Sequence, residues 1–235
     1  MAPRTLPTIY FHYNFGVDAS FICVGNLNGA FIFWMYQFSS LGKKYMAQSS
    51  KREQLIKTSM ELFYENGFHA TGIDKILDEA GVSKKTMYQY FRSKDELIYA
   101  SLRLYDSVFR NKLMKDIDAT GKTPIDKLFG IFEIVEEYFQ KDVYLGCLCT
   151  NAIAEYSAKE SMVRDIATQC GKLTRDYFAQ LAKEAGIKDY ERLADQLYLI
   201  LRGAVITTQV SQDLKHSKIA QRLARQLIEE ARSAD

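Results

Sequence analysis

Residues 65–97 read ENGFHATGIDKILDEAGVSKKTMYQYFRSKDEL, and this stretch predicts the architecture of the N-terminal part of the chain. Apolar residues recur at helical spacing from Ile73 to Ala80. Gly81 follows, where a turn needs a left-handed backbone that glycine adopts without penalty. Ser83 is a capping residue for a second short helix that extends through Phe91. Two short helices joined by a glycine turn are the pattern of a helix-turn-helix.

The second of these helices is expected to have two chemically different faces. Val82, Met87 and Phe91 face the first helix, and Tyr88 buries part of its ring. The segment 83–94 holds four cations and no acid, although residues 46–100 carry eight of each. The side chains left outside offer the hydroxyl, ammonium, amide and phenol groups that bind phosphate oxygens and base edges: Ser83, Lys84, Lys85, Thr86, Gln89 and Tyr90.

This outer face predicts binding to double-stranded DNA. Lys84, Lys85 and Lys94 can neutralise phosphates and release condensed counterions. Lys85, Thr86 and Gln89 can reach base edges in the major groove and so carry the sequence specificity. A solvated helical face without a partner is the plain alternative. The hydroxyl-rich helix behind a glycine turn favours DNA over that alternative.

The same residues resemble the DNA-binding domain of TetR-family transcriptional repressors. The Asn-Gly-Phe step, the Ala-Gly-Val turn and the block of aromatics and lysines occur at the spacings of that family, and the resemblance is close over residues 50–100. Lys85 and Gln89 differ from the residues common in the family, so no operator sequence can be transferred. The resemblance implies DNA contacts at Thr71, Gly72, Ser83, Lys84, Lys85, Thr86, Tyr88, Gln89, Tyr90 and Lys94.

The rest of the chain after residue 46 also has helical periodicity, and no convincing strand is found. We therefore expect an all-α fold of about nine helices. Residues 46–95 form a three-helix DNA-binding domain that contains the helix-turn-helix, and residues 96–235 form a ligand-binding and dimerisation bundle. The expected helices cover residues 50–66, 73–80, 84–91, from 94 past 108, 125–140, 149–157, 160–185, 189–211 and 217–232. Thr71, Ser83 and Asp189 are expected to cap three of them.

Residues 1–45 differ in composition from the rest and are expected not to belong to the native fold. No charged residue occurs from Ala19 to Gly42, and this span approaches the ~20 apolar residues that cross a bilayer. Asn26, Asn28 and two glycines within it oppose a membrane helix. Because a polar lead into an amphipathic helix starts at Met46, a start-site over-call or vector sequence is the preferred interpretation. An accessory hydrophobic extension and a membrane anchor remain the alternatives.

Composition excludes some classes of function. The net charge of +2 gives no bulk attraction to nucleic acid, so local clusters must carry binding. Four scattered cysteines suit a reducing, cytoplasmic compartment. Three distant histidines give no metal site of the usual spacing, and no cofactor motif is present. An all-helical enzyme lacks support because no acid–base cluster, nucleophile motif or phosphate loop is found.

Aromatic residues of the C-terminal part predict an apolar ligand pocket between helices. Most of them are individually as consistent with an ordinary core. Glu155, Arg175 and Arg202 could orient a polar ligand there, or lie on the surface. The candidate pocket residues are Phe109, Phe132, Tyr138, Tyr144, Cys147, Tyr156 and Tyr177.

The segment GCLCTNAIAEY, residues 146–156, places Cys147 and Cys149 near the start of a helix, where the dipole favours a thiolate. An electrophile or redox sensor is one interpretation. Two small buried apolar residues are the other.

An apolar stripe on the last two helices predicts the dimer interface, and Gly203 would permit close helix approach. Its members are Leu197, Leu201, Ala204, Val205, Thr208, Leu223 and Leu227. Such a seam would form a four-helix interface, with two reading helices about one DNA turn apart. The preferred interpretation is a homodimeric repressor of a palindromic operator that a small-molecule effector releases. A cysteine-based sensor, a non-DNA-binding adaptor of the same fold and a membrane-tethered regulator are the alternatives.

Overall fold

A computed structural model describes residues 50–120, 123–140, 144–156 and 161–233, all within one compact unit of the chain. These residues contain nine helices and no strand, so the predicted all-α class is confirmed. The expectation for residues 1–45 lies outside the described residues. The helices are α3 (Lys51–Asn66), α4 (Ile73–Ala80), α5 (Lys84–Tyr90), α6 (Lys94–Thr120), α7 (Pro124–Phe139), α8 (Leu148–Glu155), α9 (Met162–Glu184), α10 (Tyr190–Ser211) and α11 (Lys215–Ser233).

Local sequence signals account for most helix ends. Ser50 and Glu53 form a reciprocal capping box at the start of α3. Thr123 and Asp126 form another at the start of α7, where Pro124 is the first helical residue. Gly81 ends α4 in the left-handed conformation, with φ 61° and ψ 35°. These ends lie within about two residues of the predicted ones because the capping groups are close in sequence.

One predicted cap is wrong, and another has the predicted position but no cap hydrogen bond. Gly72, rather than Thr71, is the N-cap of α4, and no side chain caps that helix. Asp189 is the N-cap residue of α10, as predicted, but its side chain makes no cap hydrogen bond, and its carboxylate pairs with Arg192 at 2.8 Å. In both cases a competing contact takes the side chain away from the helix end.

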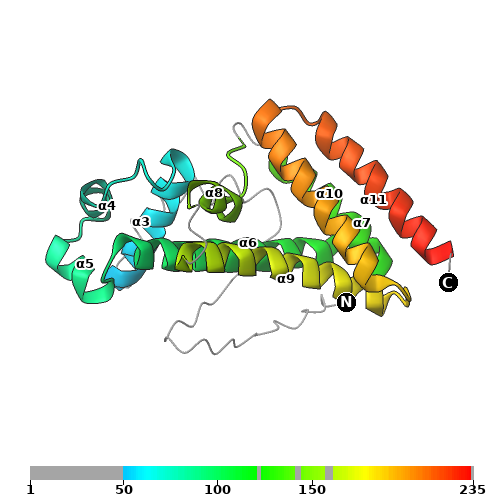
Figure 1. Cartoon of the computed structure of the whole chain (residues 1–235), viewed down its shortest axis with the longest axis horizontal. Helices are drawn as coiled ribbons and strands as arrows, with labels where there is room; N and C mark the ends of the chain where they lie inside the picture. Colours follow the sequence, from blue (N-terminus) through cyan, green and yellow to red (C-terminus); the bar gives the residue numbers. More distant parts are fainter. Residues whose placement is uncertain (1–49, 121–122, 141–143, 157–160, 234–235) are drawn as a thin grey trace, which may run out of the picture. The chain divides into compact units, whose positions relative to one another are not determined.

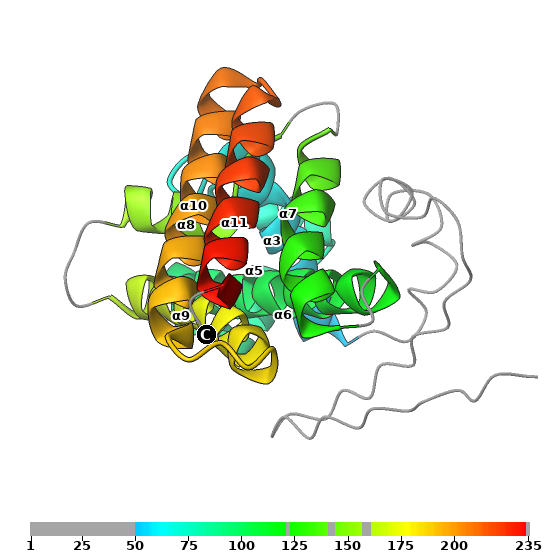
Figure 2. The same ribbon diagram turned by 90° about the vertical axis from the view of Figure 1, so that its right-hand side faces the viewer.

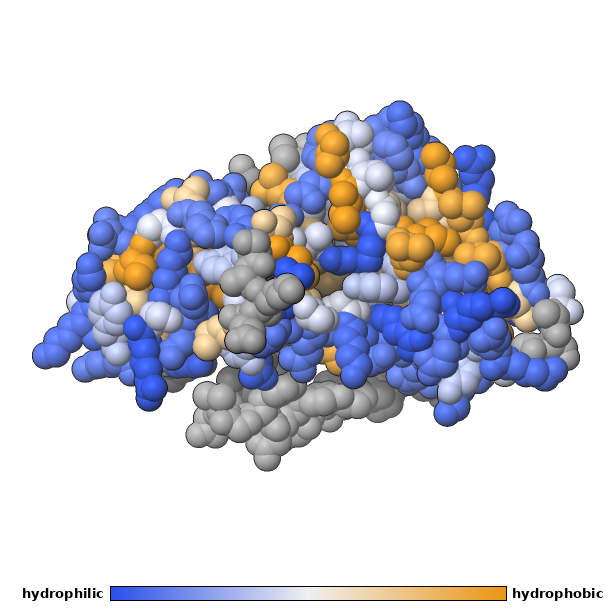
Figure 3. Space-filling model, in the orientation of Figure 1, coloured by the Kyte–Doolittle hydropathy of each residue, from blue (hydrophilic) through white to orange (hydrophobic). Residues whose placement is uncertain are grey.

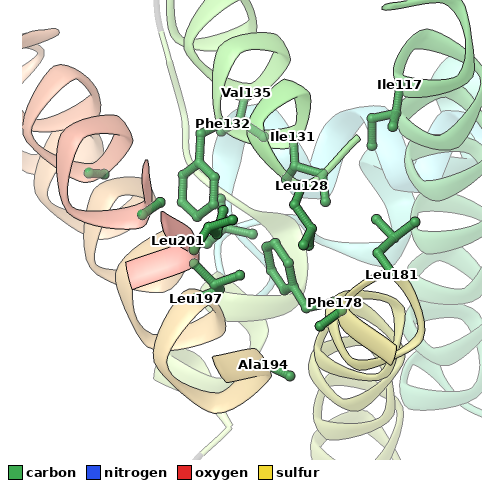
Figure 4. Packing of buried hydrophobic residues seen from close by; sticks show 14 of the residues in the cluster. Ile117, Leu128, Ile131, Phe132, Val135, Phe178, Leu181, Ala194, Leu197 and Leu201 are labelled. Carbon is green, nitrogen blue, oxygen red and sulfur yellow. The ribbon is translucent and has the colours of Figure 1, made fainter. Parts of the chain in front are cut away.

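Buried apolar side chains form two clusters, and α6 contributes to both. Its first half, with Leu97, Ile98 and Leu102, packs with α3, α4, α5, α8 and the start of α9. Its second half joins α7, α10, α11 and the end of α9, where Phe132 stacks on Phe178 with ring centroids 5.9 Å apart (Figure 4). The domain boundary predicted after residue 95 therefore falls inside the continuous helix α6. The division into two domains stays a prediction.

The helices of the C-terminal part pack on one another in pairs, and α6 and α9 run in the same direction. Helices α6 and α9 lie side by side, and α10 packs against both α9 and α11 (Figure 1). In the view turned by 90°, α11 lies between α10 and α7 and packs against both (Figure 2). The short helix α8 packs on α6 and α9 and belongs to the same apolar cluster as the helix-turn-helix.

Candidate nucleic-acid interface

Helix α5 is held by the face that the sequence predicts. Met87 is fully buried, and Val82 and Phe91 are 6% and 3% exposed within the cluster that also contains Ile76 and Leu77. Burying such side chains stabilises the fold by roughly 1.5–3 kcal/mol each. This packing fixes α5 against α4 and determines which side chains face solvent.

The opposite face of α5 is exposed and polar. The Ser83 hydroxyl accepts a hydrogen bond from the Thr86 amide at 3.1 Å and lies 2.8 Å from the Thr86 hydroxyl. The Lys84 ammonium lies 3.6 Å from Asp74 of α4, and both side chains are mostly exposed, so the pair is weak. Tyr88 and Tyr90 remain 47% and 42% exposed. Lys85 and Gln89 are also exposed, so α5 offers to solvent the groups expected to contact DNA.

Two of the predicted DNA-contact side chains have other partners. Thr71 is fully buried, and its hydroxyl donates to the carbonyls of Gly67 at 2.7 Å and Leu62 at 3.2 Å. The Lys94 ammonium donates to the Phe68 carbonyl at 2.6 Å, and its burial lowers its pKa. The Thr71 side chain is therefore not available to phosphate, which corrects that expectation. The Lys94 side chain is partly held by its hydrogen bond to the loop before α4.

A substitution at Thr71 tests this structural role. Thr71→Val keeps the shape but removes the buried hydroxyl that donates to the Gly67 carbonyl, so we expect the free energy of unfolding to fall by about 1–3 kcal/mol. Thr71→Ser retains the hydroxyl and should lose less. Chemical denaturation of both variants measures the difference. Equal stability of Thr71→Val and the parent protein would restore Thr71 as a candidate DNA contact.

A carboxylate of α8 holds the loop between α3 and α4. Glu155 accepts hydrogen bonds from the amides of Phe68 at 3.0 Å and His69 at 2.8 Å, and its oxygen lies 2.9 Å from the His69 ring nitrogen Nδ1. Burial raises the pKa of Glu155, but these hydrogen bonds outweigh burial, and the pKa lies below its ordinary value. We call this contact the Glu155 latch.

Aromatic contacts extend the Glu155 latch to the start of α6. The Tyr156 ring lies 5.0 Å from the His69 ring and 6.1 Å from the Phe68 ring, between centroids. Its hydroxyl reaches the Asp95 carboxylate at 3.5 Å. The end of α8 thus contacts both the helix-turn-helix loop and α6. Glu155 and His69 are 86 residues apart in the sequence, so no local sequence pattern predicts their contact.

The other end of α8 contains a second group of polar side chains. Cys147 is the N-cap residue of α8, and the Arg202 guanidinium donates to the Thr150 hydroxyl in its first turn. Cys149 and Cys170 are buried in the same apolar cluster as Cys147. Hydrogen bonds join Cys147 to Cys149 and Cys149 to Cys170. Cys170 and Arg202, which are distant in the sequence, are therefore brought beside the neighbouring Cys147 and Cys149.

All the predicted ligand-pocket residues except Tyr156 belong to one apolar cluster or pack against it. Phe109, Tyr138, Tyr144 and Cys147 lie along the interior near α6, where Tyr105 stacks on Phe109 at 6.1 Å and Phe109 meets Tyr138 at 5.7 Å. Phe132 lies in the apolar cluster of α7, α10, α11 and the second half of α6, and Tyr177 packs against that cluster. Tyr156 belongs to the Glu155 latch.

The hollows of the described surface add little support to that pocket. One of about 90 Å³ is lined by Phe132, Phe129 and Arg225, and one of about 440 Å³ lies between residues 187–196 and the end of α11. Arg175 lies on the surface in ion pairs with Glu191 and Asp195. The pocket therefore stays a prediction.

Most of the predicted dimer stripe lies inside the protomer, whereas its member Leu223 on α11 is 48% exposed. Leu197, Leu201, Ala204, Val205 and Thr208 are each at most 7% exposed and belong to the core of the protomer, while Leu227 packs against it. Helix α10 has a second apolar stripe that the sequence reading missed. Its side chains Leu199, Ile206 and Val210 are 73%, 44% and 81% exposed, and Ile219 and Leu223 of α11 are also exposed. These apolar side chains gather over α10 and α11 (Figure 3).

Comparison with known proteins agrees with this geometry. A family model for bacterial regulatory proteins of the tetR family matches residues 55–100. A helix-turn-helix regulator encoded in the lacX 3′ region of Lactococcus lactis is 26% identical over 167 residues, which cover 69% of this chain and 85% of that protein. The regulator YerO of Bacillus subtilis is 34% identical over 163 residues, which cover 67% of this chain and 54% of YerO. The match thus spans about half of YerO.

A solved structure gives the same fold. A TetR-type regulator of Streptomyces avermitilis is 29% identical, with a TM-score of 0.69 over 78% of this chain and 98% of the other. Helices α3–α5 correspond to the segment that the family model matches, and α5 exposes the polar face described above. The chain belongs to the TetR family of DNA-binding bacterial transcriptional regulators.

Proposed function

We propose that this protein is a homodimeric repressor that binds a palindromic operator through α5 and is released by a small-molecule effector. The observation that supports it most is the exposed polar face of α5, with Lys85, Thr86 and Gln89 held outward by the burial of Met87. Phosphate contacts would position the protein, and these three side chains would read base edges. The role is regulatory rather than catalytic and requires access to DNA in the cytoplasm.

The second apolar stripe supports the dimer. Leu199, Ile206 and Val210 recur at helical spacing on α10, and Gly203 lies between them with open space beside its Cα. With Ile219 and Leu223 of α11, they form an apolar surface on two adjacent helices, which we call the α10–α11 face. A second copy of the chain would cover this face through a four-helix seam. Two reading helices related by a two-fold axis then require a palindromic site.

The Glu155 latch supports communication between effector and DNA. Helix α8 contacts Arg202 of α10 through Thr150 near its start, and the loop between α3 and α4 through Glu155 at its end. An effector that binds one arrangement of α8 more tightly shifts the population between operator-binding and released states. The proposed coupling of effector binding to DNA binding requires only that the effector has different affinities for the two arrangements of α8.

Replacing Glu155 tests the latch. Glu155→Gln removes the charge that accepts three hydrogen bonds, so we expect about 1–3 kcal/mol less stability at neutral pH and a weaker response of operator binding to effector. Because the pKa of Glu155 is lowered in the folded state, this stabilisation is present at neutral pH and is lost as the pH falls through that pKa. The stability difference between parent and variant should therefore shrink in acid.

Thermal denaturation across pH measures this difference. Glu184→Gln, an exposed glutamate of α9 bonded to Gln180, is the matched control and should change little. A difference in stability that is independent of pH would contradict the role of the Glu155 carboxylate.

Selection of genomic fragments by the purified full-length protein tests the function itself. We expect enrichment of a palindromic sequence, with affinity that falls steeply as salt is raised. A reporter fused to the enriched promoter should be more active without the regulator gene, whereas lower activity would indicate an activator. No enrichment from the native genome would favour a non-DNA-binding adaptor.

A further inference from the structure

Cys147 has a chemical environment unlike that of the other described cysteines. Cys149 and Cys170 are buried, 3% and 5% exposed, whereas Cys147 is only partly buried. The Cys149 thiol donates to the Cys147 sulfur, and Thr150 and Arg202 lie beside that sulfur. A sulfur that accepts hydrogen bonds and faces a guanidinium is stabilised as a thiolate, which is the nucleophilic form.

The direction of the thiol pKa values agrees with this arrangement. The hydrogen bond from Cys149, followed by Arg202 and Thr150, lowers the pKa of Cys147 well below its ordinary value against the effect of burial. Hydrogen bonds to Cys147 and Cys170 raise the pKa of Cys149, which therefore remains a protonated donor. One cysteine of the pair is thus nucleophilic and the other is not.

Aromatic side chains surround this sulfur. Burial, followed by the nearby Cys147, raises the pKa of Tyr64 to about 12, and the same causes raise the pKa of Tyr144 and Tyr105. Arg202 also lies over the Tyr198 ring, 5.9 Å from its centroid. Neutral phenol rings favour a flat conjugated molecule, and a guanidinium favours a developing negative charge on its oxygen.

We propose that Cys147 senses small α,β-unsaturated carbonyl compounds, such as enones and quinones, by forming a covalent adduct. The sulfur attacks the β-carbon, a C–S bond forms and the C=C π bond breaks. The electron pair moves to the carbonyl oxygen beside Arg202, and the α-carbon then takes a proton from water. The net change is addition of the thiol across the double bond, so no oxidant is needed. This inference rests on the proposed function, because the adduct is the effector signal.

The packing at Cys147 explains how an adduct would reach the DNA-binding helices. The preceding Gly146 has φ +84°, and a side chain there would collide with Gln209. The Tyr64 hydroxyl of α3 donates to the Gly146 carbonyl at 3.3 Å. Added atoms at Cys147 therefore displace the start of α8. The end of the same eight-residue helix carries Glu155, which holds the loop before α4.

Labelling of the free protein tests the chemistry without DNA. In a Cys23→Ser background, limiting N-ethylmaleimide should modify Cys147 before Cys149 and Cys170, as measured by peptide mass spectrometry. The pH midpoint of the reaction rate should lie below that of an unstructured peptide thiol. Arg202→Met should move the pH midpoint of the Cys147 reaction rate upward, because the guanidinium that stabilises the thiolate is lost. Arg175→Met, which removes a surface arginine from its ion pairs, is the matched control.

Operator binding by the labelled protein tests the signal. The Cys147 adduct should bind selected genomic DNA at least tenfold more weakly, while Cys147→Ser and Cys147→Ala should bind DNA and resist release by the reagent. First labelling at Cys149 or Cys170, an adduct with unchanged DNA affinity, or release of both Cys147 variants would overturn the proposal. Failure of the unlabelled protein to bind any genomic fragment would instead contradict the proposed function.

Discussion

Replacing both Leu199 and Val210 by aspartate is expected to produce a monomer that binds its operator about 10²–10⁴-fold more weakly. The two side chains are 73% and 81% exposed in the protomer, so the substitutions place charges on the α10–α11 face without entering the core. A dimer engages the second half-site at high effective concentration, and a monomer loses that advantage. Light scattering measures the mass, and a binding titration on the selected operator measures the affinity.

Two comparison variants make this result specific. Met162→Asp adds the same charge at a 46%-exposed apolar position on α9 and should leave both mass and affinity unchanged. Leu197→Asp places a charge at a fully buried position of α10 and should unfold the protomer instead. A stable dimer in the Leu199→Asp/Val210→Asp variant would show that the seam lies elsewhere.

Replacing Lys84 and Lys85 by alanine is expected to weaken operator binding on the order of a thousandfold near physiological salt, since a dimer loses four cations. The slope of log affinity against log salt should become shallower by about 3.6, at about 0.9 for each phosphate contact. Both lysines are exposed, and the pair of Lys84 with Asp74 at 3.6 Å is weak, so stability should change little.

The salt titration separates phosphate contacts from base contacts. Lys115→Ala/Lys172→Ala removes two exposed lysines of α6 and α9 and should preserve the slope. Gln89→Ala should keep the slope but reduce the discrimination between bases at one position by roughly 1–3 kcal/mol. An unchanged slope in the Lys84→Ala/Lys85→Ala variant would remove α5 from the proposed interface.

The sequence alone predicted the features that depend on neighbouring residues. The helix-turn-helix, the left-handed Gly81 and the inward Met87 and Phe91 rely on spacing, capping and turn chemistry within about ten residues. Most helix ends have the same local origin. The resemblance to one family extended these local signals to a DNA-binding role, which the comparisons confirm.

Contacts between distant residues were decided only by the tertiary structure. The sequence predicts Thr71 as a helix cap that contacts DNA, yet its hydroxyl is buried and bonds to the carbonyls of Gly67 and Leu62. Helix α10 has two apolar stripes, of which the sequence analysis identified one, and periodicity does not decide which stripe the rest of the chain covers. Leu197 and Leu201 lie in the core of the protomer, whereas Leu199 and Val210 are exposed. The Glu155 latch and the grouping of Cys147 with Arg202 likewise require helices brought together from distant parts of the chain, because no local spacing encodes them.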